Sequence, residues 1–322
     1  MTLLILACAS SMRAADTGEA ADARTEAEAW TPTPAPDPGA AMLTPLIEVP
    51  PYSTVLECYY GTYSGPDVGV VYMYPETNAP EFSHHNQLKA VSDDEYPDGT
   101  MIPCPEGAGG MQSNYTPLFE GVGVTPETVD KDWLELPEGI AMRLSSGQRW
   151  VVDTHFVNSG KETLWARSAI SLGFVAVDEV EQWASAYQFD AGGLAIPPGA
   201  DYTTTFGCEF GTDVHVLSLM GHMHGLGSSY RVDLTVGSNV STVYDVNPWK
   251  PEYRDTPIIE NYAADAFPAA AHDVFTTTCA WHNETDDTLG YPDEMCTTVG
   301  VAYPLEAPVT CFGGNVEISR RP

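Results

Sequence analysis

The stretch RWVVDTHFV, residues 149–157, has the alternation of side chains that a half-buried β-strand requires. One face of such a strand would be largely apolar and would pack in the core; its residues are Trp150, Val152, Thr154 and Phe156. Asp153 and His155 would project together from the opposite face, which is not simply apolar. The stretch therefore predicts a strand that presents a carboxylate and an imidazole side by side.

Short β-prone runs of the same kind follow one another along the chain, separated by clusters of turn-forming residues. Convincing long amphipathic helices are absent from the pattern. We expect strands at residues 68–74, 149–157, 169–177, 201–209, 213–223, 228–236, 273–281 and 296–303. Many short strands with regular turns predict an all-β protein made of antiparallel β-sandwiches.

The length of 322 residues allows two domains of ordinary size. An Ile-Pro-Pro-Gly break at residues 196–199 comes just before an expected strand, so we place a domain boundary shortly ahead of it, within residues 178–195. The expected units are an N-terminal β-sandwich over residues 46–185 and a C-terminal β-sandwich over residues 186–322.

The charge balance is strongly acidic, with 13 basic residues against 45 acidic residues and a formal charge of −32. Nucleic-acid phosphates need lysine and arginine partners, so nucleic acid is excluded as an expected ligand. An anionic membrane surface is disfavoured for the same reason. The charge is typical of a self-repelling protein outside the cytoplasm, and it concentrates cations near the surface.

The N-terminal residues 1–8, MTLLILAC, form a short apolar run that ends in Cys8. This ending resembles the remnant of a bacterial lipoprotein signal in which Cys8 carries a lipid anchor, and an apolar tip on a disordered tail is the alternative. Residues 9–45 are rich in Ala, Glu, Thr and Pro, so we expect a disordered tether. The expected location is extracytoplasmic, either anchored to a bacterial membrane or secreted.

Apart from Cys8 the chain has six cysteines and no Cys-x-x-Cys pair, which disfavours a zinc ribbon or a thioredoxin-type site. An even number in an exported chain predicts three disulfides. Six cysteines allow fifteen pairings, and spacing alone does not choose among them.

Two of the eight histidines lie one residue apart in LMGHMHGLG, residues 219–227. In a strand, His222 and His224 would project from the same face, close enough to share one metal ion. For an isolated His-x-His motif, two histidines packed in a strand are the commoner explanation.

A second pair, His84 and His85, lies in the stretch FSHHN. Adjacent residues of a regular strand point to opposite faces, so these imidazoles converge only at a strand end, a bulge or a turn. Ser83 and Asn86 favour such an irregularity. A solvated loop pair is the alternative here, and a structural role is the alternative for His155 in its strand.

Met295 lies in the stretch DEMC, directly before a cysteine and an expected strand. Methionine is normally core filler, but a thioether held rigidly beside a disulfide is a ligand that favours copper, especially Cu(I), over zinc. Three histidines remain outside these motifs, and we assign them structural or supporting roles: His215, His272 and His282.

Taken in order, the motifs SHHN, VVDTHF, IPPGADYTTTFGCEF, HMHGLGSSYRV and DEMC resemble those of the copper type II, ascorbate-dependent monooxygenases. That family includes peptidylglycine α-hydroxylating monooxygenase and dopamine β-monooxygenase. The resemblance spans roughly residues 50–320. It implies two tandem antiparallel, jelly-roll-like β-sandwich domains that face each other across a solvent-filled cleft.

The resemblance further implies two copper ions per chain, one in each domain. The first ion would store and deliver an electron, and its ligands would be His84, His85 and His155. The second would bind O₂ and hydroxylate a C–H bond of a small organic substrate, and its ligands would be His222, His224 and Met295. Ascorbate or another one-electron reductant would be the co-substrate. The disulfides implied are Cys58–Cys104, Cys208–Cys311 and Cys279–Cys296, the last clamping the loop that presents the methionine.

The substrate-binding positions depart from the family pattern. In the peptidylglycine enzyme the substrate carboxylate is held by an Arg two residues before the His-x-His and by an Asn and a Tyr after the ligand Met. The matching positions here are Met220, Thr297 and Val299, and none can pair with a carboxylate as Arg does. We therefore expect a more apolar pocket. Asp153 stands where the peptidylglycine enzyme has a neutral amide side chain. In this chain its carboxylate could tune the first copper or accept a proton.

Other functions remain open at this point. A copper-binding lipoprotein for storage, delivery or sensing would keep the six ligands without turnover. A zinc hydrolase is disfavoured because His-Glu-x-x-His is absent. An adhesion-type β-sandwich would carry the same histidines and bind no metal.

Overall fold

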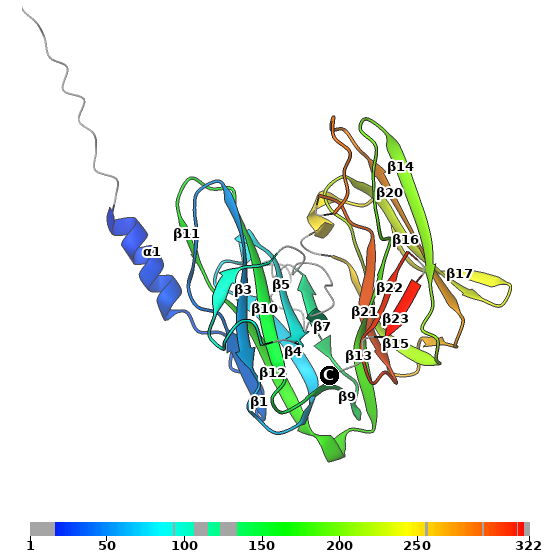
Figure 1. Ribbon diagram of the computed structural model, residues 1–322, viewed down its shortest axis with the longest axis horizontal. Helices are drawn as coiled ribbons and strands as arrows, with labels where there is room; N and C mark the ends of the chain where they lie inside the picture. The colour runs from blue at the N-terminus through cyan, green and yellow to red at the C-terminus, as the bar shows by residue number, and fades with distance from the viewer. Residues whose placement is uncertain are drawn as a thin grey trace, which may run out of the picture.

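The computed structural model describes residues 17–92, 94–105, 115–122, 134–254, 257–291, 293–313 and 315–318. The all-β prediction is confirmed, because antiparallel sheets in sandwich-like layers make up most of the described chain (Figure 1). Short 3₁₀ turns lie at η1 (Pro80–Phe82), η2 (Val177–Glu179) and η3 (Pro251–Arg254). Across the described part of the chain, no helix is both long and apolar enough to cross a bilayer.

The first half of the chain is a sandwich of two sheets. One sheet has the order β6-β3-β10-β5-β7. Its strands are β3 (Ser53–Thr62), β5 (Ser83–Val91), β6 (Met101–Pro103), β7 (Tyr115–Val122) and β10 (Arg149–Asn158). The opposite layer follows the order β1-β12-β4-β9, with β8 beside β4. Its strands are β1 (Gly39–Leu43), β4 (Val68–Thr77), β8 (Leu134–Glu135), β9 (Ile140–Leu144) and β12 (Ser168–Ala176). The small pair β2 (Ile47–Val49) and β11 (Leu164–Ala166) lies beside them.

Packing between these layers follows the period of two that the sequence shows. Leu88 and Val152, from β5 and β10, are buried against Met73 and Ile170 from β4 and β12. Apolar area removed from water in this way is the main stabilising contribution to such a sandwich.

The second half repeats the arrangement with different strands. One layer is β14-β20-β16-β17. Its strands are β14 (Asp201–Cys208), β16 (Gly227–Val236), β17 (Asn239–Val246) and β20 (Val274–His282). The facing layer follows β13-β21-β15-β18, with β19, β22 and β23 attached. Its strands are β13 (Gln182–Asp190), β15 (Val214–His222), β18 (Ile259–Asn261), β19 (Pro268–Ala269), β21 (Thr297–Tyr303), β22 (Val309–Phe312) and β23 (Asn315–Ile318). Phe189, Leu219, Phe275 and Trp281 are among the residues of its core.

Strand β13 belongs to both halves. Its residues 182–184 pair in parallel with residues 140–142 of β9, and its residues 185–190 pair antiparallel with β21. A continuous sheet of 12 strands therefore runs through both halves. The boundary expected at residues 185/186 falls inside a hydrogen-bonded strand, so a shared sheet joins the two sandwiches at that point.

The expected disordered tether over residues 9–45 is corrected from residue 17 onward. Helix α1 (Thr17–Ala29) is rich in Ala and Glu, which are good helix formers, and it packs on β11. Arg24 pairs with Glu28 at 2.8 Å and lies 4.8 Å over the ring of Trp165. Strand β1 then pairs along its whole length with β12. The expected signal remnant at residues 1–8, with its anchor at Cys8, lies outside the described residues.

All eight strands expected from the sequence are present, with ends that differ by a few residues at most. The three disulfides expected from the resemblance are also confirmed, as Cys58–Cys104, Cys208–Cys311 and Cys279–Cys296. Three disulfides are typical of a protein that folds outside the cytoplasm.

Candidate metal centre

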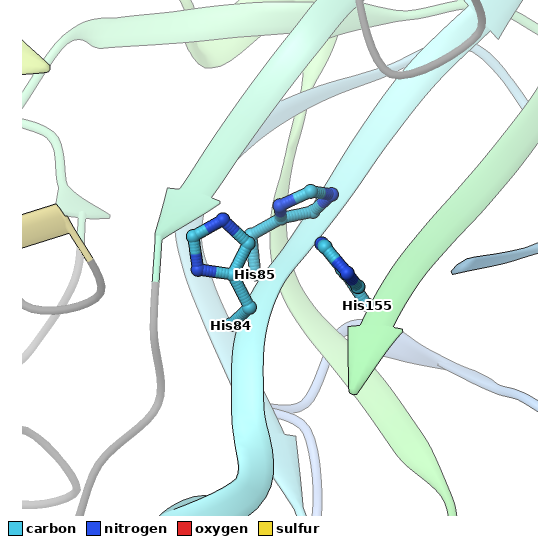
Figure 2. Close-up of side chains that lie close together, drawn as sticks. All are labelled: His84, His85 and His155. Atoms are coloured by element: carbon cyan, nitrogen blue, oxygen red, sulfur yellow. The ribbon is translucent and has the colours of Figure 1, made fainter. Parts of the chain in front are cut away.

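Three histidines converge in the first half of the molecule (Figure 2). His84 and His85 lie on β5 and His155 lies on the neighbouring strand β10. One ring nitrogen of each lies within 4.8 Å of the other two. The ring centroids are 4.7 to 5.1 Å apart. This arrangement offers three imidazole nitrogens to one metal ion.

A β-bulge makes the convergence possible. His155 pairs with His85, while the next residue of β10, Phe156, pairs with Ser83. His84 is therefore the extra residue of the bulge, and its side chain does not follow the regular alternation. A bulge, one of the irregularities that two adjacent histidines need in order to converge, thus brings His84 and His85 together.

Polar neighbours orient two of the rings. The Nε2 atom of His155 lies 2.6 Å from the hydroxyl oxygen of Thr54. The Nε2 atom of His85 lies 3.2 Å from a carboxylate oxygen of Asp153. The contact with Thr54 engages Nε2 of His155 and leaves Nδ1 of that ring for a metal, while His85 and Asp153 make a close polar contact. Contacts of this kind fix the orientation of an imidazole and raise its basicity as a ligand.

A buried ion pair supports the contact to His85. The ammonium of Lys89 lies 2.6 Å from the second carboxylate oxygen of Asp153, and both side chains are almost completely buried. Burial by itself would raise the pKa of Asp153, but the Lys89 charge and the contact with His85 lower it below its ordinary value. The carboxylate is therefore ionised at neutral pH.

The electrostatics of the cluster favour neutral imidazoles. Burial lowers the pKa of His155 to about 3, and the neighbouring His85 and His84 contribute to the shift. A neutral imidazole is the form that binds a metal.

The second histidine pair lies at the end of β15. His222 is the last residue of this strand and pairs with Thr297 of β21, while His224 follows in the turn before β16. Their ring centroids are 5.2 Å apart. The expectation of one regular strand carrying both histidines is corrected in this detail, because the strand ends between them.

Glu294 holds the backbone of this turn. Its buried carboxylate accepts hydrogen bonds from the backbone N–H groups of His224 and Leu226, at 3.0 and 2.8 Å, and from the indole N–H of Trp281 at 3.0 Å. The Nδ1 atom of His224 lies 2.9 Å from the backbone oxygen of Asp293. That contact fixes the orientation of the His224 ring.

Met295 follows directly after Asp293 and Glu294, which contact the turn of His224, and its side chain is half-buried. The next residue, Cys296, forms the disulfide with Cys279 of β20. Backbone and covalent contacts on both sides therefore hold the segment that carries Met295 beside the turn of His224.

The two histidine sets meet each other. The ring of His84 lies 6.1 Å, centroid to centroid, from the ring of His224, with the planes at 77°. At this point side chains of the first and second halves are neighbours.

Each of the remaining histidines lies close to a carboxylate. His282 lies 2.7 Å from Asp201, and His272 lies 3.1 Å from Glu209. His215 lies 3.6 Å from a carboxylate oxygen of Asp265 and stacks on Tyr303.

The three positions that depart from the family pattern are buried: Met220, Thr297 and Val299. Met220 and Val299 pair across β15 and β21 and pack together with Ile259. The Thr297 hydroxyl donates a hydrogen bond of 2.8 Å to Asp190.

Sequence reasoning missed Lys89 and the role of Glu294. Lys89 shares strand parity with His85, and a lysine at that position, four residues after a candidate ligand, was the available signal. Glu294 lies inside the DEMC motif, but only its contacts reveal what it holds.

Replacing Glu294 by Gln is expected to destabilise the protein and disturb the second histidine pair. A Gln amide offers one acceptor oxygen and an NH₂ group, so at least one buried N–H loses its acceptor at a cost of about 2–3 kcal/mol. Urea unfolding measures the free energy of unfolding, and copper titration measures metal binding. Glu284→Gln, at an exposed position ten residues earlier in the sequence, is the control. Equal stability and copper binding in both variants would contradict the assigned role of Glu294.

Comparison with known proteins identifies no relative. None of the protein-family models matches the chain, and no curated protein matches it. Among solved structures, PNGase F, a glycosylasparaginase from Flavobacterium meningosepticum, covers 83% of this chain and 98% of its own at 9% identity, with a TM-score of 0.35. The major capsid protein P2 of bacteriophage PM2 covers 82% and 97% at 8% identity, with a TM-score of 0.32. Likenesses this weak carry no argument about function.

Proposed function

We propose that this chain is a copper-dependent monooxygenase that hydroxylates a C–H bond of a small organic substrate. It would use O₂ and an external one-electron reductant, ascorbate or another of its class. The observation that carries the proposal is the convergence of His84, His85 and His155, with one ring nitrogen of each within 4.8 Å of the others. The second pair, His222 and His224, supports it because it meets this cluster directly.

The donor atoms suit copper. Imidazole binds Cu, Zn, Fe and Ni, and a thioether selects Cu(I) among these. The first set is made of imidazoles, and the second pair lies beside the segment that carries Met295. When bound, copper would supply one-electron cycling between Cu(I) and Cu(II) and activation of O₂.

The surrounding residues have separate tasks in this proposal. The carboxylate of Asp153 lies 3.2 Å from Nε2 of His85, and the charge of Lys89 keeps that carboxylate ionised. Thr54 fixes the ring of His155. Glu294 holds the backbone of the turn that presents His224.

A peptide that ends in a free glycine is expected to be a poor substrate. The positions that would anchor its carboxylate hold Met220, Thr297 and Val299, whose side chains are buried and include no cation. The measurement is O₂ consumption with such a peptide, compared with a panel of apolar substrates that lack a carboxylate. Efficient hydroxylation of the glycine-extended peptide would contradict this expectation.

The direct test of the proposed function is O₂ uptake by the copper-loaded protein with ascorbate and a substrate panel, read together with product mass. We expect O₂ uptake that depends on copper and a product one oxygen atom heavier. The buried state of Met220, Thr297 and Val299, which leaves no recognised substrate anchor, favours one alternative, a non-catalytic copper-binding lipoprotein. Copper binding without any coupled O₂ uptake would support that alternative and contradict the monooxygenase. A lipid anchor at Cys8 remains a separate prediction.

A further inference from the structure

A cavity of about 580 Å³ lies in the first half of the molecule, apart from the histidine cluster. Its lining comes from residues 37–40 at the start of β1, from residues 63–68 between β3 and β4, and from residues 174–177 at the end of β12. His155 pairs with Leu56 of β3, and Tyr63 lies seven residues further along the chain, which at about 3.3 Å per residue is roughly 20 Å away. The cavity has the size of a small-molecule site.

The walls of this cavity are mostly apolar and carry two aromatic rings. The rings of Tyr63 and Phe174 lie 5.8 Å apart, centroid to centroid, with their planes at 71°. Backbone hydrogen bonds hold both residues, because Tyr63 N–H donates to the oxygen of Gln148 at 2.9 Å and Phe174 N–H donates to the oxygen of Pro38 at 2.8 Å. Valine, alanine and proline residues complete the lining. The walls therefore offer apolar surface to a ligand, together with ring faces that attract cations.

The charge on the lining is entirely negative. Asp37 and Asp67 line the cavity and are exposed, and none of the described residues that line it is Lys, Arg or His. One carboxylate oxygen of Asp67 accepts a hydrogen bond of 2.7 Å from the backbone N–H of Ser146, which fixes this side chain. A carboxylate has a second oxygen that can accept from a ligand. Burial and the charge of Asp67 raise the pKa of Tyr63, so its hydroxyl is neutral at physiological pH.

These features favour one class of ligand. A calcium ion takes about six to eight oxygen ligands, and two carboxylates on apolar walls do not supply them. An anion would be repelled by both carboxylates, and the formal charge of −32 acts in the same direction. A neutral apolar molecule would make no use of the carboxylates. An organic ammonium ion uses both features, because its charge pairs with the carboxylates and its apolar part packs on the walls.

We propose that this cavity binds a small organic ammonium ion, with Asp37 and Asp67 pairing with its charge and the rings of Tyr63 and Phe174 packing against it. The inference goes beyond the proposed function, because the site lies towards the other end of β3 from the partner of His155 and requires no metal. It does not depend on whether the chain is a monooxygenase.

The test is isothermal titration calorimetry of the full chain with probes of equal length: hexylammonium, 1-hexanol and hexanoate. We expect hexylammonium to bind about tenfold more tightly than 1-hexanol, the combined effect of two exposed ion pairs, and hexanoate to give no measurable binding. Added salt should weaken the binding of hexylammonium and leave that of 1-hexanol unchanged, because salt screens exposed charges. Copper-loaded and chelator-treated samples should give the same affinities.

Variants locate the binding. Asp37→Asn and Asp67→Asn should each weaken hexylammonium binding about threefold, and the double variant roughly tenfold, without affecting 1-hexanol. Both positions are exposed, so the variants should fold as wild type does. Phe174→Leu keeps an apolar wall and removes a ring face, so it should weaken hexylammonium more than 1-hexanol. Asp178→Asn makes the same charge change at an exposed residue that does not line the cavity, and it is the matched control.

Equal affinity for hexylammonium and 1-hexanol, or no binding of hexylammonium, would overturn the proposal. An equal loss in Asp178→Asn and Asp67→Asn would also overturn it, because the acidic surface as a whole would then attract the cation. Coupled O₂ uptake without ammonium binding would leave the proposed function intact. Ammonium binding by a protein that takes up no copper would leave this site standing and contradict the monooxygenase.

Discussion

Replacing His155 by Ala is expected to lower the copper content from two ions per chain to one and to abolish substrate hydroxylation. The variant removes one of three converging imidazoles from the first set and leaves the second set untouched. Loss of a residue that merely orients a metal ligand typically costs about 10–100-fold in activity or affinity, so loss of a ligand should cost more than about 100-fold. The measurements are copper per chain by elemental analysis and O₂ uptake coupled to product.

Met295→Ala is the complementary variant. It should lose turnover to a similar extent while the three imidazoles of the first set still bind copper. His272→Ala, a change at an exposed histidine paired with Glu209, should keep full copper content and activity. Unchanged copper binding and turnover in His155→Ala would remove the first set from the proposed site.

Replacing Lys89 by Met is expected to cost about 3–5 kcal/mol of stability in the metal-free protein at neutral pH, because it leaves a buried carboxylate without its cation. The partner carboxylate, on Asp153, is completely buried and lies 2.6 Å from the Lys89 ammonium. The free energy of unfolding in urea measures the effect. Lys161→Met, at an exposed position, is the matched control and should change stability little.

The effect of Lys89→Met should depend on pH with a definite sign. In wild type the folded pKa of Asp153 lies below the ordinary 3.8, so ionised Asp153 stabilises the protein above that pH and the contribution is lost as pH falls through the folded pKa. Without Lys89, burial dominates and raises the pKa, so the variant loses stability as pH rises above 3.8. The deficit should therefore be larger at neutral pH than at about pH 4. A deficit that is constant with pH would contradict the assigned ion pair.

The strands could be predicted because their information is local. The alternation in residues 149–157 specifies a strand and its two faces without reference to any other segment. Long-range pairing has no such signature. The parallel pairing of β13 with β9 depends on how two distant segments meet, so the sheet that runs through both halves could not be foreseen.

For the N-terminal segment, the local sequence led to a wrong prediction, a disordered tether where the structure has a helix. Composition suggested a tether, but the Ala-rich and Glu-rich part is a good helix former and finds a surface on β11. The helix becomes predictable only when the apolar partner for Ala27 and the ring of Trp165 beside Arg24 are known.

The clustering of His84, His85 and His155 could be predicted from the sequence, whereas the residues that support the cluster could not. Strand parity excluded a regular strand for His84 and His85, and the bulge resolves that conflict. A lysine in a strand is usually solvent-exposed, so the shared parity of Lys89 and His85 did not by itself predict a buried ion pair with Asp153. The contact of His84 with His224 joins residues 140 positions apart, and only the folded chain brings them together.

The most direct test of the account is anomalous diffraction from crystals of the copper-loaded protein at the copper and zinc edges. The account predicts two copper peaks, one among the imidazoles of His84, His85 and His155 and one beside His222, His224 and the sulfur of Met295. Zinc at either position, or the absence of a metal peak among the three converging imidazoles, would contradict it.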